Sequence, residues 1–227
     1  MEAKEKLKFG KLFTLPEHSI CYGWLASFEY PWQAFDALGD FIRETGAALP
    51  RDVYEQRGED VWVARDVTVA PTATLTGPLI VCPGAQIRTG AFIRGNVVVG
   101  AGAVVGNSTE LKNCVLFDGV EVPHFNYVGD SILGYRAHLG AGAVTSNIKS
   151  DRRNVVIHVG NEAIETGRRK LGALLGDFAE VGCNSVLNPG TVIGRHATVY
   201  PLSSVRGYVP EGHIYKTAGN VVKKRDE

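Results

Sequence analysis

Aliphatic residues recur at every sixth position through the middle of the chain. They occupy Val63, Val69, Leu75, Val81, Ile87, Ile93, Val99, Val105 and Leu111. A period of six fits neither an α-helix nor an isolated strand. One short strand and one turn per hexad, with the aliphatic side chain pointing into a narrow interior, accounts for it. The pattern therefore predicts an all-β parallel β-helix, whereas a β-sandwich would show period two.

The hexad frame is interrupted twice. Ten residues separate Pro123 from the resumption of the frame at Leu133, and the aliphatic pattern is lost from Asn147 to about Leu174. Inside the second interruption, residues 155–159 and 163–166 flank Gly160-Asn161, which predicts a β-hairpin projecting as an arm. Interruptions of a regular solenoid are the first places to look for function. The frame then continues through the positions Leu175, Val181, Leu187, Ile193, Val199 and Val205.

The first sixty residues differ from the repeat. Pro31, then Phe35, Leu38 and Ile42 at helical spacing, and Gly46 as a stop predict one amphipathic helix. We expect it to cap the open end of the β-helix, a requirement of solenoids. The predicted organisation is a capping segment at 1–60, a β-helix at 61–210 with its arm at about 147–174, and a C-terminal tail at 211–227. The basic end of this tail is read as a solvated terminus, with a phosphate-binding role as the alternative.

Charge and composition exclude several function classes. Lys plus Arg and Asp plus Glu are both 24, so no long-range field attracts nucleic acid or an anionic membrane. Apolar runs are too short for a bilayer span and the N-terminus lacks an apolar signal core, so we expect a cytoplasmic protein. The four cysteines show no paired spacing and are expected to be reduced thiols. The 27 glycines agree with a repeat rich in turns.

Candidate chemistry is concentrated around the first interruption. Arg94 and Lys112 lie eighteen positions apart, one coil of three hexads, and should project from the same face. Two stacked cations repel unless an anion or a neighbouring acid lies between them. A phosphate would suit, and the alternative is two solvated charges. His124, at an irregular site beside Tyr127, could act as a general base, and the alternative is a structural histidine.

The hexad pattern resembles that of the hexapeptide-repeat transferases, which implies a left-handed parallel β-helix assembled as a homotrimer. More specifically, the chain is similar to the acetyltransferase half of bifunctional glucosamine-1-phosphate acetyltransferase/N-acetylglucosamine-1-phosphate uridylyltransferase. The matching motifs are Val105-Gly106-Asn107 through Glu110 and Lys112, His124-x-x-Tyr127-Val128-Gly129-Asp130, and Leu139-Gly140-Ala141-Gly142-Ala143 with Asn147. The later stretch Gly167-Arg168-Arg169-Lys170-Leu171-Gly172-Ala173 looks closer to archaeal-type sugar-1-phosphate enzymes.

This resemblance implies an acetyl-coenzyme A dependent N-acetyltransferase acting on glucosamine-1-phosphate or galactosamine-1-phosphate. His124 would be the base that deprotonates the sugar amine, and no metal is expected. The resemblance also implies that substrate is held by Arg94, Lys112, Tyr127 and His138, together with Lys170 from a neighbouring subunit. A histidine at 138 replaces an asparagine of the bacterial enzymes, which leaves the sugar undetermined.

The resemblance further implies a coenzyme groove lined by Ala141, Asn147, Cys183 and Pro201, with a backbone amide near Ala141 for the thioester oxyanion. Cys183 needs no nucleophilic role, and packing explains it better. Two alternatives remain open. One is a non-catalytic trimeric module that binds sugar phosphates or serves as a scaffold for a nucleotidylyltransferase. The other is a metal enzyme of the carbonic anhydrase kind, using His124 and His138. Uridylyltransferase activity is not expected, since no glycine-rich nucleotide loop is seen.

Overall fold

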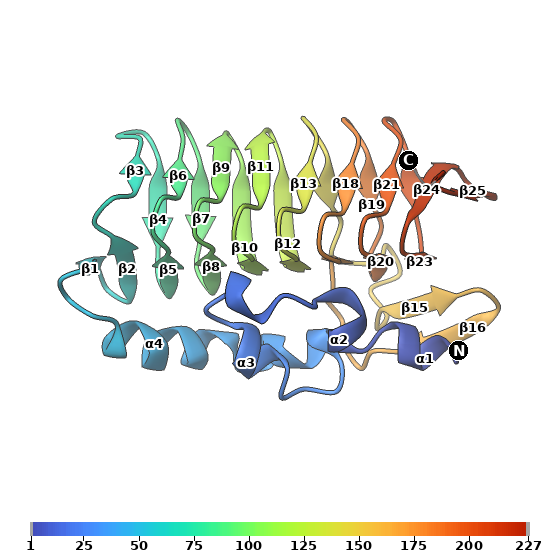
Figure 1. Ribbon diagram of the computed structural model, residues 1–227, viewed down its shortest axis with the longest axis horizontal. Helices are drawn as coiled ribbons and strands as arrows, with labels where there is room; N and C mark the ends of the chain where they lie inside the picture. Colours follow the sequence, from blue (N-terminus) through green and yellow to red (C-terminus); the bar gives the residue numbers. More distant parts are fainter. Residues whose placement is uncertain (1, 226–227) are drawn as a thin grey trace.

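The computed structural model describes residues 2–225 and consists mainly of a β-helix whose strands follow one another along a single axis (Figure 1). Its strands form three columns of parallel pairs, which we call the first, second and third faces. The first face contains β2 (Val61–Ala64), β5 (Leu79–Val81), β8 (Val97–Val99), the ends of β10 (Glu110–Leu116) and β12 (Tyr127–Leu133), β17 (Ala173–Leu175), β20 (Thr191–Ile193) and β23 (Tyr208–Val209).

The other two faces are built in the same way. The second face contains β3 (Thr68–Val69), β6 (Gln86–Ile87), β9 (Val104–Asn107), β11 (Glu121–His124), β13 (His138–Leu139), β18 (Glu180–Val181), β21 (Thr198–Val199) and β24 (His213–Thr217). The third face contains β4 (Thr74–Thr76), β7 (Phe92–Arg94), the starts of β10 and β12, β14 (Val144–Thr145), β19 (Val186–Leu187) and β22 (Ser204–Val205). The predicted hexapeptide-repeat β-helix is confirmed.

The hexad aliphatics fill the interior. Val81, Ile93, Val99, Val105 and Leu111 are all fully buried. The same holds along the later coils at Leu139, Leu175, Leu187, Ile193 and Val205. Each coil thus contributes one inward aliphatic side chain per face, and stacking of the coils excludes water from all of them.

The first face is buried on both sides, unlike the other two. Every residue of β5, β8 and β17 is buried, whereas the second and third faces alternate buried with exposed positions. Strands covered on both sides read as continuous apolar runs, and Leu79-Ile80-Val81 and Val97-Val98-Val99 are such runs. Another layer must therefore cover this side of the solenoid.

That layer is the N-terminal segment, which lies along the side of the solenoid rather than over its open end (Figure 1). Its helices are α1 (Ala3–Lys6), α2 (Phe9–Leu12), η1 (Pro16–His18), α3 (Tyr22–Leu25), η2 (Pro31–Asp36) and α4 (Leu38–Ala48). The single helix expected from Pro31 to Gly46 is divided into η2 and α4. Helix α4 packs on β5 and β8, and the Phe13 ring lies 5.1 Å from the fully buried Phe117.

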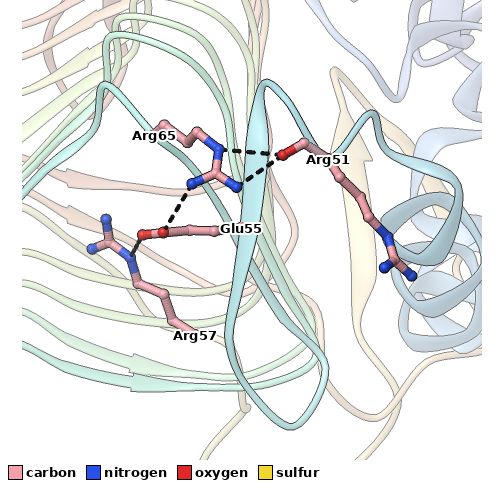
Figure 2. Close-up of polar contacts among 4 residues, drawn as sticks. All are labelled: Arg51, Glu55, Arg57 and Arg65. Atoms are coloured by element: carbon pink, nitrogen blue, oxygen red, sulfur yellow. Dashed lines mark hydrogen bonds and ion pairs between the residues drawn. The ribbon is translucent and has the colours of Figure 1, made fainter.

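The first coil is extended on its first face by a strand, and no helix covers this end among the described residues. Strand β1 (Tyr54–Gly58) pairs antiparallel with β2. The Arg65 guanidinium donates to the carbonyl oxygen of Arg51 at 2.9 Å and to Glu55 at 3.4 Å, and Arg57 donates to the same carboxylate (Figure 2). These contacts fasten the chain before β1 to the first coil.

The first frame break lies elsewhere than expected. Ile93 pairs with Leu111, eighteen positions on, but Val97 pairs with Cys114, seventeen positions on. The corner between the third and first faces therefore has one residue, Asn113, where the preceding coil has two. Asp130 occupies the same single-residue corner one coil later.

Both corner residues take left-handed backbone angles, with φ of 48° for Asn113 and 47° for Asp130. Asparagine and aspartate tolerate this region better than other side chains except glycine. The interior positions after Leu111 are consequently Leu116, Val122, Val128 and Leu133, all fully buried. A fixed period of six extended from Leu111 misassigned these positions and displaced the break to 123–133.

The second interruption forms the expected hairpin, β15 (Val156–Val159) paired with β16 (Glu162–Glu165). Its apolar side chains Ile157, Val159 and Ile164 are buried, and β15 contacts β23, so it lies against the solenoid. At the C-terminus, β25 (Asn220–Lys223) pairs with β24, which places Lys223 in a hairpin. The last two residues of the expected tail lie outside the described residues.

Candidate functional site

His124 ends strand β11 at the corner between the second and third faces, which we call the His124 edge. The side chain is exposed, as is that of the next residue, Phe125, whose φ is 53°. Asn126, only 2% exposed, holds this corner. It accepts from the His124 backbone N–H at 3.1 Å and donates to the carbonyl oxygens of Gly140 and Ala143 at 2.9 and 3.0 Å.

Four of the residues expected at the site stack along the His124 edge, one in each of successive coils. They are His124, Ala141, Cys183 and Pro201. Backbone hydrogen bonds connect the coils, with Gly142 donating to His124 at 3.0 Å, Asn184 to Ala141 at 2.8 Å and Leu202 to Cys183 at 2.9 Å. Within residues 2–225 the Ala141 N–H has no backbone or side-chain acceptor, so it is available to an oxyanion.

His138 lies near this edge, on the outer side of the second face. It pairs in register with Glu121 in one coil and Glu180 in the next, and its Nδ1 is 2.8 Å from Glu180 Oε2. The carboxylate fixes the ring orientation, and a protonated ring would form an ion pair with it.

Arg94 and Lys112 project from the third face in successive coils, as their spacing predicted. A neighbouring acid compensates Arg94, because its Nη1 donates to Glu110 Oε1 at 2.7 Å. The hydrogen bond to Glu110 is the largest cause that raises the pKa of Arg94. Among the described residues Lys112 forms no ion pair, so it is the less compensated cation of the two.

Tyr127 begins β12 on the third face and its side chain turns away from His124. A Cβ placed on Gly129 would lie 2.5 Å from the Tyr127 hydroxyl oxygen, so the ring occupies the space that a side chain at 129 would fill. The hydroxyl accepts from Asn147 Nδ2 at 3.2 Å. Burial, followed by the charges of Asp130 and Glu110, raises the pKa of Tyr127.

Asn147 and Lys170 lie at the opposite edge of the third face, which we call the Asp130 edge. Asp130 is 4% exposed and accepts from Asn113 at 2.7 Å and from Asn147 at 2.5 Å. Lys170 reaches this edge because its backbone forms a bridge with Ile148. The structure therefore separates Asn147 from Ala141, Cys183 and Pro201, with which sequence analysis had grouped it.

The expected site residues thus form two groups within one chain. Asn107, the register partner of His124, lies five residues before Lys112, with the corner at Ser108 between them, so roughly 15 Å is the upper limit of their backbone separation. The sequence analysis missed Asn126, the paired corner residues Asn113 and Asp130, and the role of Glu110. Among residues 2–225, no cluster of three or more His, Cys, Asp or Glu side chains suits a metal ion. No helix in that range is long and apolar enough to cross a bilayer.

The repeat, the columns of parallel strands and the inward aliphatic side chains define the class: the chain is a hexapeptide-repeat β-helix protein. Residues 75–166, less than half of the chain, match the family model described as the GMPPB C-terminal domain. The resemblance inferred from the motifs is confirmed by two curated relatives.

One relative is the bifunctional sugar-1-phosphate nucleotidylyltransferase/acetyltransferase of Sulfurisphaera tokodaii, 38% identical over 112 residues that cover 49% of this chain and 28% of that protein. Another is the bifunctional protein GlmU of Methanococcus maripaludis, 28% identical over 173 residues that cover 68% of this chain and 42% of that protein. The chain spans less than half the length of these relatives. A solved mutant of perosamine N-acetyltransferase from Caulobacter crescentus, with CoA and GDP-perosamine, is 17% identical with a TM-score of 0.34, covering 73% of this chain and 57% of that one.

Proposed function

We propose that the chain is an acetyl-coenzyme A dependent N-acetyltransferase acting on an amino-sugar 1-phosphate, with glucosamine-1-phosphate and galactosamine-1-phosphate as the candidate substrates. The observation that carries the proposal is the His124 edge. An exposed imidazole and, one coil away, a backbone N–H without an acceptor lie on one continuous edge with Cys183 and Pro201. The relatives from Sulfurisphaera tokodaii, named as a nucleotidylyltransferase/acetyltransferase, and from Methanococcus maripaludis, named GlmU, support the acetyltransferase class.

The chemistry needs no covalent enzyme intermediate. His124 accepts the proton that the sugar amine loses as its nitrogen attacks the thioester carbonyl. A C–N bond forms, the C–S bond breaks, and the thiol leaves after receiving a proton. The N–H of Ala141 donates to the carbonyl oxygen while that oxygen carries negative charge. Cys183 and Pro201 line the coenzyme groove beyond it.

The sugar phosphate is assigned to the third face. Lys112 supplies a cation that has no ion pair among residues 2–225, Arg94 supplies a second once it exchanges Glu110 for the phosphate, and Tyr127 contacts the substrate. His138 contacts the sugar from the second face, while Asn147 and Lys170 act from the Asp130 edge. Because His124 lies at one edge of the third face and Asn147 and Lys170 at the other, we place the complete site between copies of a homotrimer.

A thiol-release assay with acetyl-coenzyme A tests this proposal, with the two amino-sugar 1-phosphates as acceptors and the corresponding N-acetylated sugars as controls. Thiol release that requires the free amine supports the proposed transfer. Absence of release with either amino sugar, from protein that is folded and trimeric, would reject it.

A second candidate is a non-catalytic trimeric module that binds sugar phosphates, and one observation favours it. Glu110 already compensates Arg94, which lowers the positive charge on the face that would hold the phosphate. Calorimetry with acetyl-coenzyme A separates the two candidates, because a module without catalysis has no need for saturable coenzyme binding.

A further inference from the structure

Basic residues converge where the β15–β16 hairpin joins the solenoid. The segment entering the hairpin contains Lys149, Arg152 and Arg153, and the segment leaving it contains Arg168, Arg169 and Lys170. The antiparallel bridge between Ile148 and Lys170 brings the two segments together. A chain with no net charge thus carries a local concentration of positive charge at the base of the hairpin.

These two segments border a cavity of about 1080 Å³, which we call the arm-base cavity. Its walls include Trp32 and Gln33 from η2, Asp130 at the corner, and Arg152, Arg169 and Lys170 from the hairpin base. The cavity therefore lies between the N-terminal layer, the solenoid and the hairpin. Binding there would depend on all three parts of the chain.

The charges around the arm-base cavity are only partly compensated. Arg168 Nη1 donates to Asp36 at 2.7 Å and Lys149 lies 3.3 Å from Asp151. Asp130 accepts from two asparagine side chains, as described above. Within residues 2–225, Arg152, Arg169 and Lys170 make no ion pair, and Arg168 Nε is buried without an acceptor. Cations held this close repel one another, which raises the electrostatic energy of the free protein. Binding of an anion with two or more charges lowers that energy.

The size of the cavity limits what that anion can be. A volume near 1080 Å³ is slightly above the roughly 300–1000 Å³ typical of small-molecule sites. It far exceeds an inorganic phosphate and leaves room beside a phosphorylated hexose. The uncharged polar side chains of Gln33 and Ser150 line the same space, where they can donate to or accept from a ligand.

We propose that the arm-base cavity binds the diphosphate of a nucleoside diphosphate, with Arg152, Arg169 and Lys170 around the phosphates and the nucleoside toward Gln33 and Ser150. The proposal shares Lys170 with the proposed acetyltransferase site, but it does not require acetyl transfer at His124. His124 and Asp130 lie at opposite edges of the third face, six residues apart along the chain or roughly 20 Å at full extension.

Two sources share this chemistry, since coenzyme A also carries a nucleoside diphosphate. Calorimetric titration of the full chain with UDP, GDP, inorganic pyrophosphate, coenzyme A and phosphate-free uridine examines them together. We expect saturable binding of UDP, GDP and pyrophosphate, none of uridine, and weakening of binding by added salt.

The variant Arg152→Gln/Arg169→Gln tests the location of binding. It removes two charges from exposed side chains and retains their approximate length, so the fold should be kept, as checked by circular dichroism. We expect affinity for UDP and pyrophosphate to fall at least tenfold. Arg153→Gln is the matched control, because Arg153 lies next in sequence but does not line the cavity, and we expect less than a twofold change.

The outcomes separate the possibilities. No saturable binding of any diphosphate, or binding that the double variant leaves unchanged, overturns the proposal. Loss of UDP binding with coenzyme A binding retained supports a free nucleotide or nucleotide sugar as the ligand. Loss of both, with competition between them, supports the coenzyme. His124→Ala should leave the affinities for UDP, GDP and pyrophosphate unchanged while it removes acetyl transfer, so failure of the acetyltransferase proposal is distinguishable from failure of this one.

Discussion

The Arg94 guanidinium is held by the Glu110 carboxylate of the next coil at 2.7 Å, on the face assigned to the sugar phosphate. Both side chains are substantially exposed, 45% for Arg94 and 32% for Glu110, so the pair contributes little to stability. Its main effect is on the charge that a ligand meets.

Glu110→Gln should therefore change substrate binding more than stability. We expect a lower KM for the sugar phosphate with little change in kcat, because Arg94 becomes free to bind the phosphate while glutamine keeps a hydrogen-bond acceptor. Steady-state kinetics and urea unfolding measure the two effects. Glu162→Gln, on the exposed hairpin, is the control. A raised KM would mean that Glu110 positions the substrate itself.

His124→Ala should abolish most acetyl transfer and leave folding and assembly intact, because the side chain is exposed and makes no hydrogen bond within residues 2–225. Loss of a general base typically lowers kcat by about 10²–10⁴-fold. Thiol release measures activity, and light scattering after size exclusion measures assembly. Full activity in this variant would remove His124 from the mechanism.

Asn126→Asp should destabilise the protein by about 3 kcal/mol or more. The buried amide donates to two carbonyl oxygens, and a carboxylate in its place would oppose both while remaining buried. Urea unfolding near pH 7 measures the loss. Asn161→Asp in the exposed hairpin turn is the matched substitution and should change little; equal effects would show that the corner does not depend on this amide.

Gly106→Ala should prevent stable folding. A Cβ at this position would lie 1.5 Å from the carbonyl oxygen of Pro123, a backbone atom in the next coil that cannot move without separating the two strands. Soluble yield and thermal unfolding test this. Gly10→Ala, which meets no atom within 4 Å in α2, should be neutral or slightly stabilising. A Gly106→Ala protein with unchanged Tm would contradict the packing described here.

Asp118 predicts a pH dependence of stability. Burial raises its pKa above the ordinary value of 3.8, although the Ala101 N–H donates to it at 2.7 Å. The folded state therefore binds the proton more tightly than the unfolded state, and stability falls as pH rises from 3.8 through the folded pKa.

Asp118→Asn keeps the acceptor for Ala101 and removes the titration. The free energy of unfolding should then fall less steeply over that pH range, and above it the variant should be more stable than the parent protein. Urea unfolding at a series of pH values tests this, with the exposed Asp52→Asn as control. A slope identical to that of the parent would exclude Asp118 as its source.

Short-range periodicity was sufficient for most of the fold. The aliphatic hexads predicted the solenoid, and Gly160-Asn161 between two alternating stretches predicted the hairpin, because both patterns depend only on neighbouring residues. The grouping of Ala141, Cys183 and Pro201 came from the family resemblance, and the structure stacks them in one column with His124, which the displaced frame could not place.

Long-range contacts were not predictable in this way. Nothing in the pattern from Pro31 to Gly46 says whether a helix covers an end or a side, although the runs at 79–81 and 97–99 indicate strands covered on both sides. The single-residue corners at Asn113 and Asp130 are deletions, which a search with a fixed period misplaces. The Arg94–Glu110 pair depends on side-chain conformation, which spacing does not determine.

The N-terminal layer also determines how copies of this protein can meet. With its first face occupied, the prism presents only two bare flanks to a neighbour, and these join along the ridge that carries His124. In a closed ring of identical copies each subunit must use both flanks, so the imidazole of every subunit would stand beside a seam. Across that seam it would face the neighbouring copy's equivalents of the groups that its own chain holds on the far ridge.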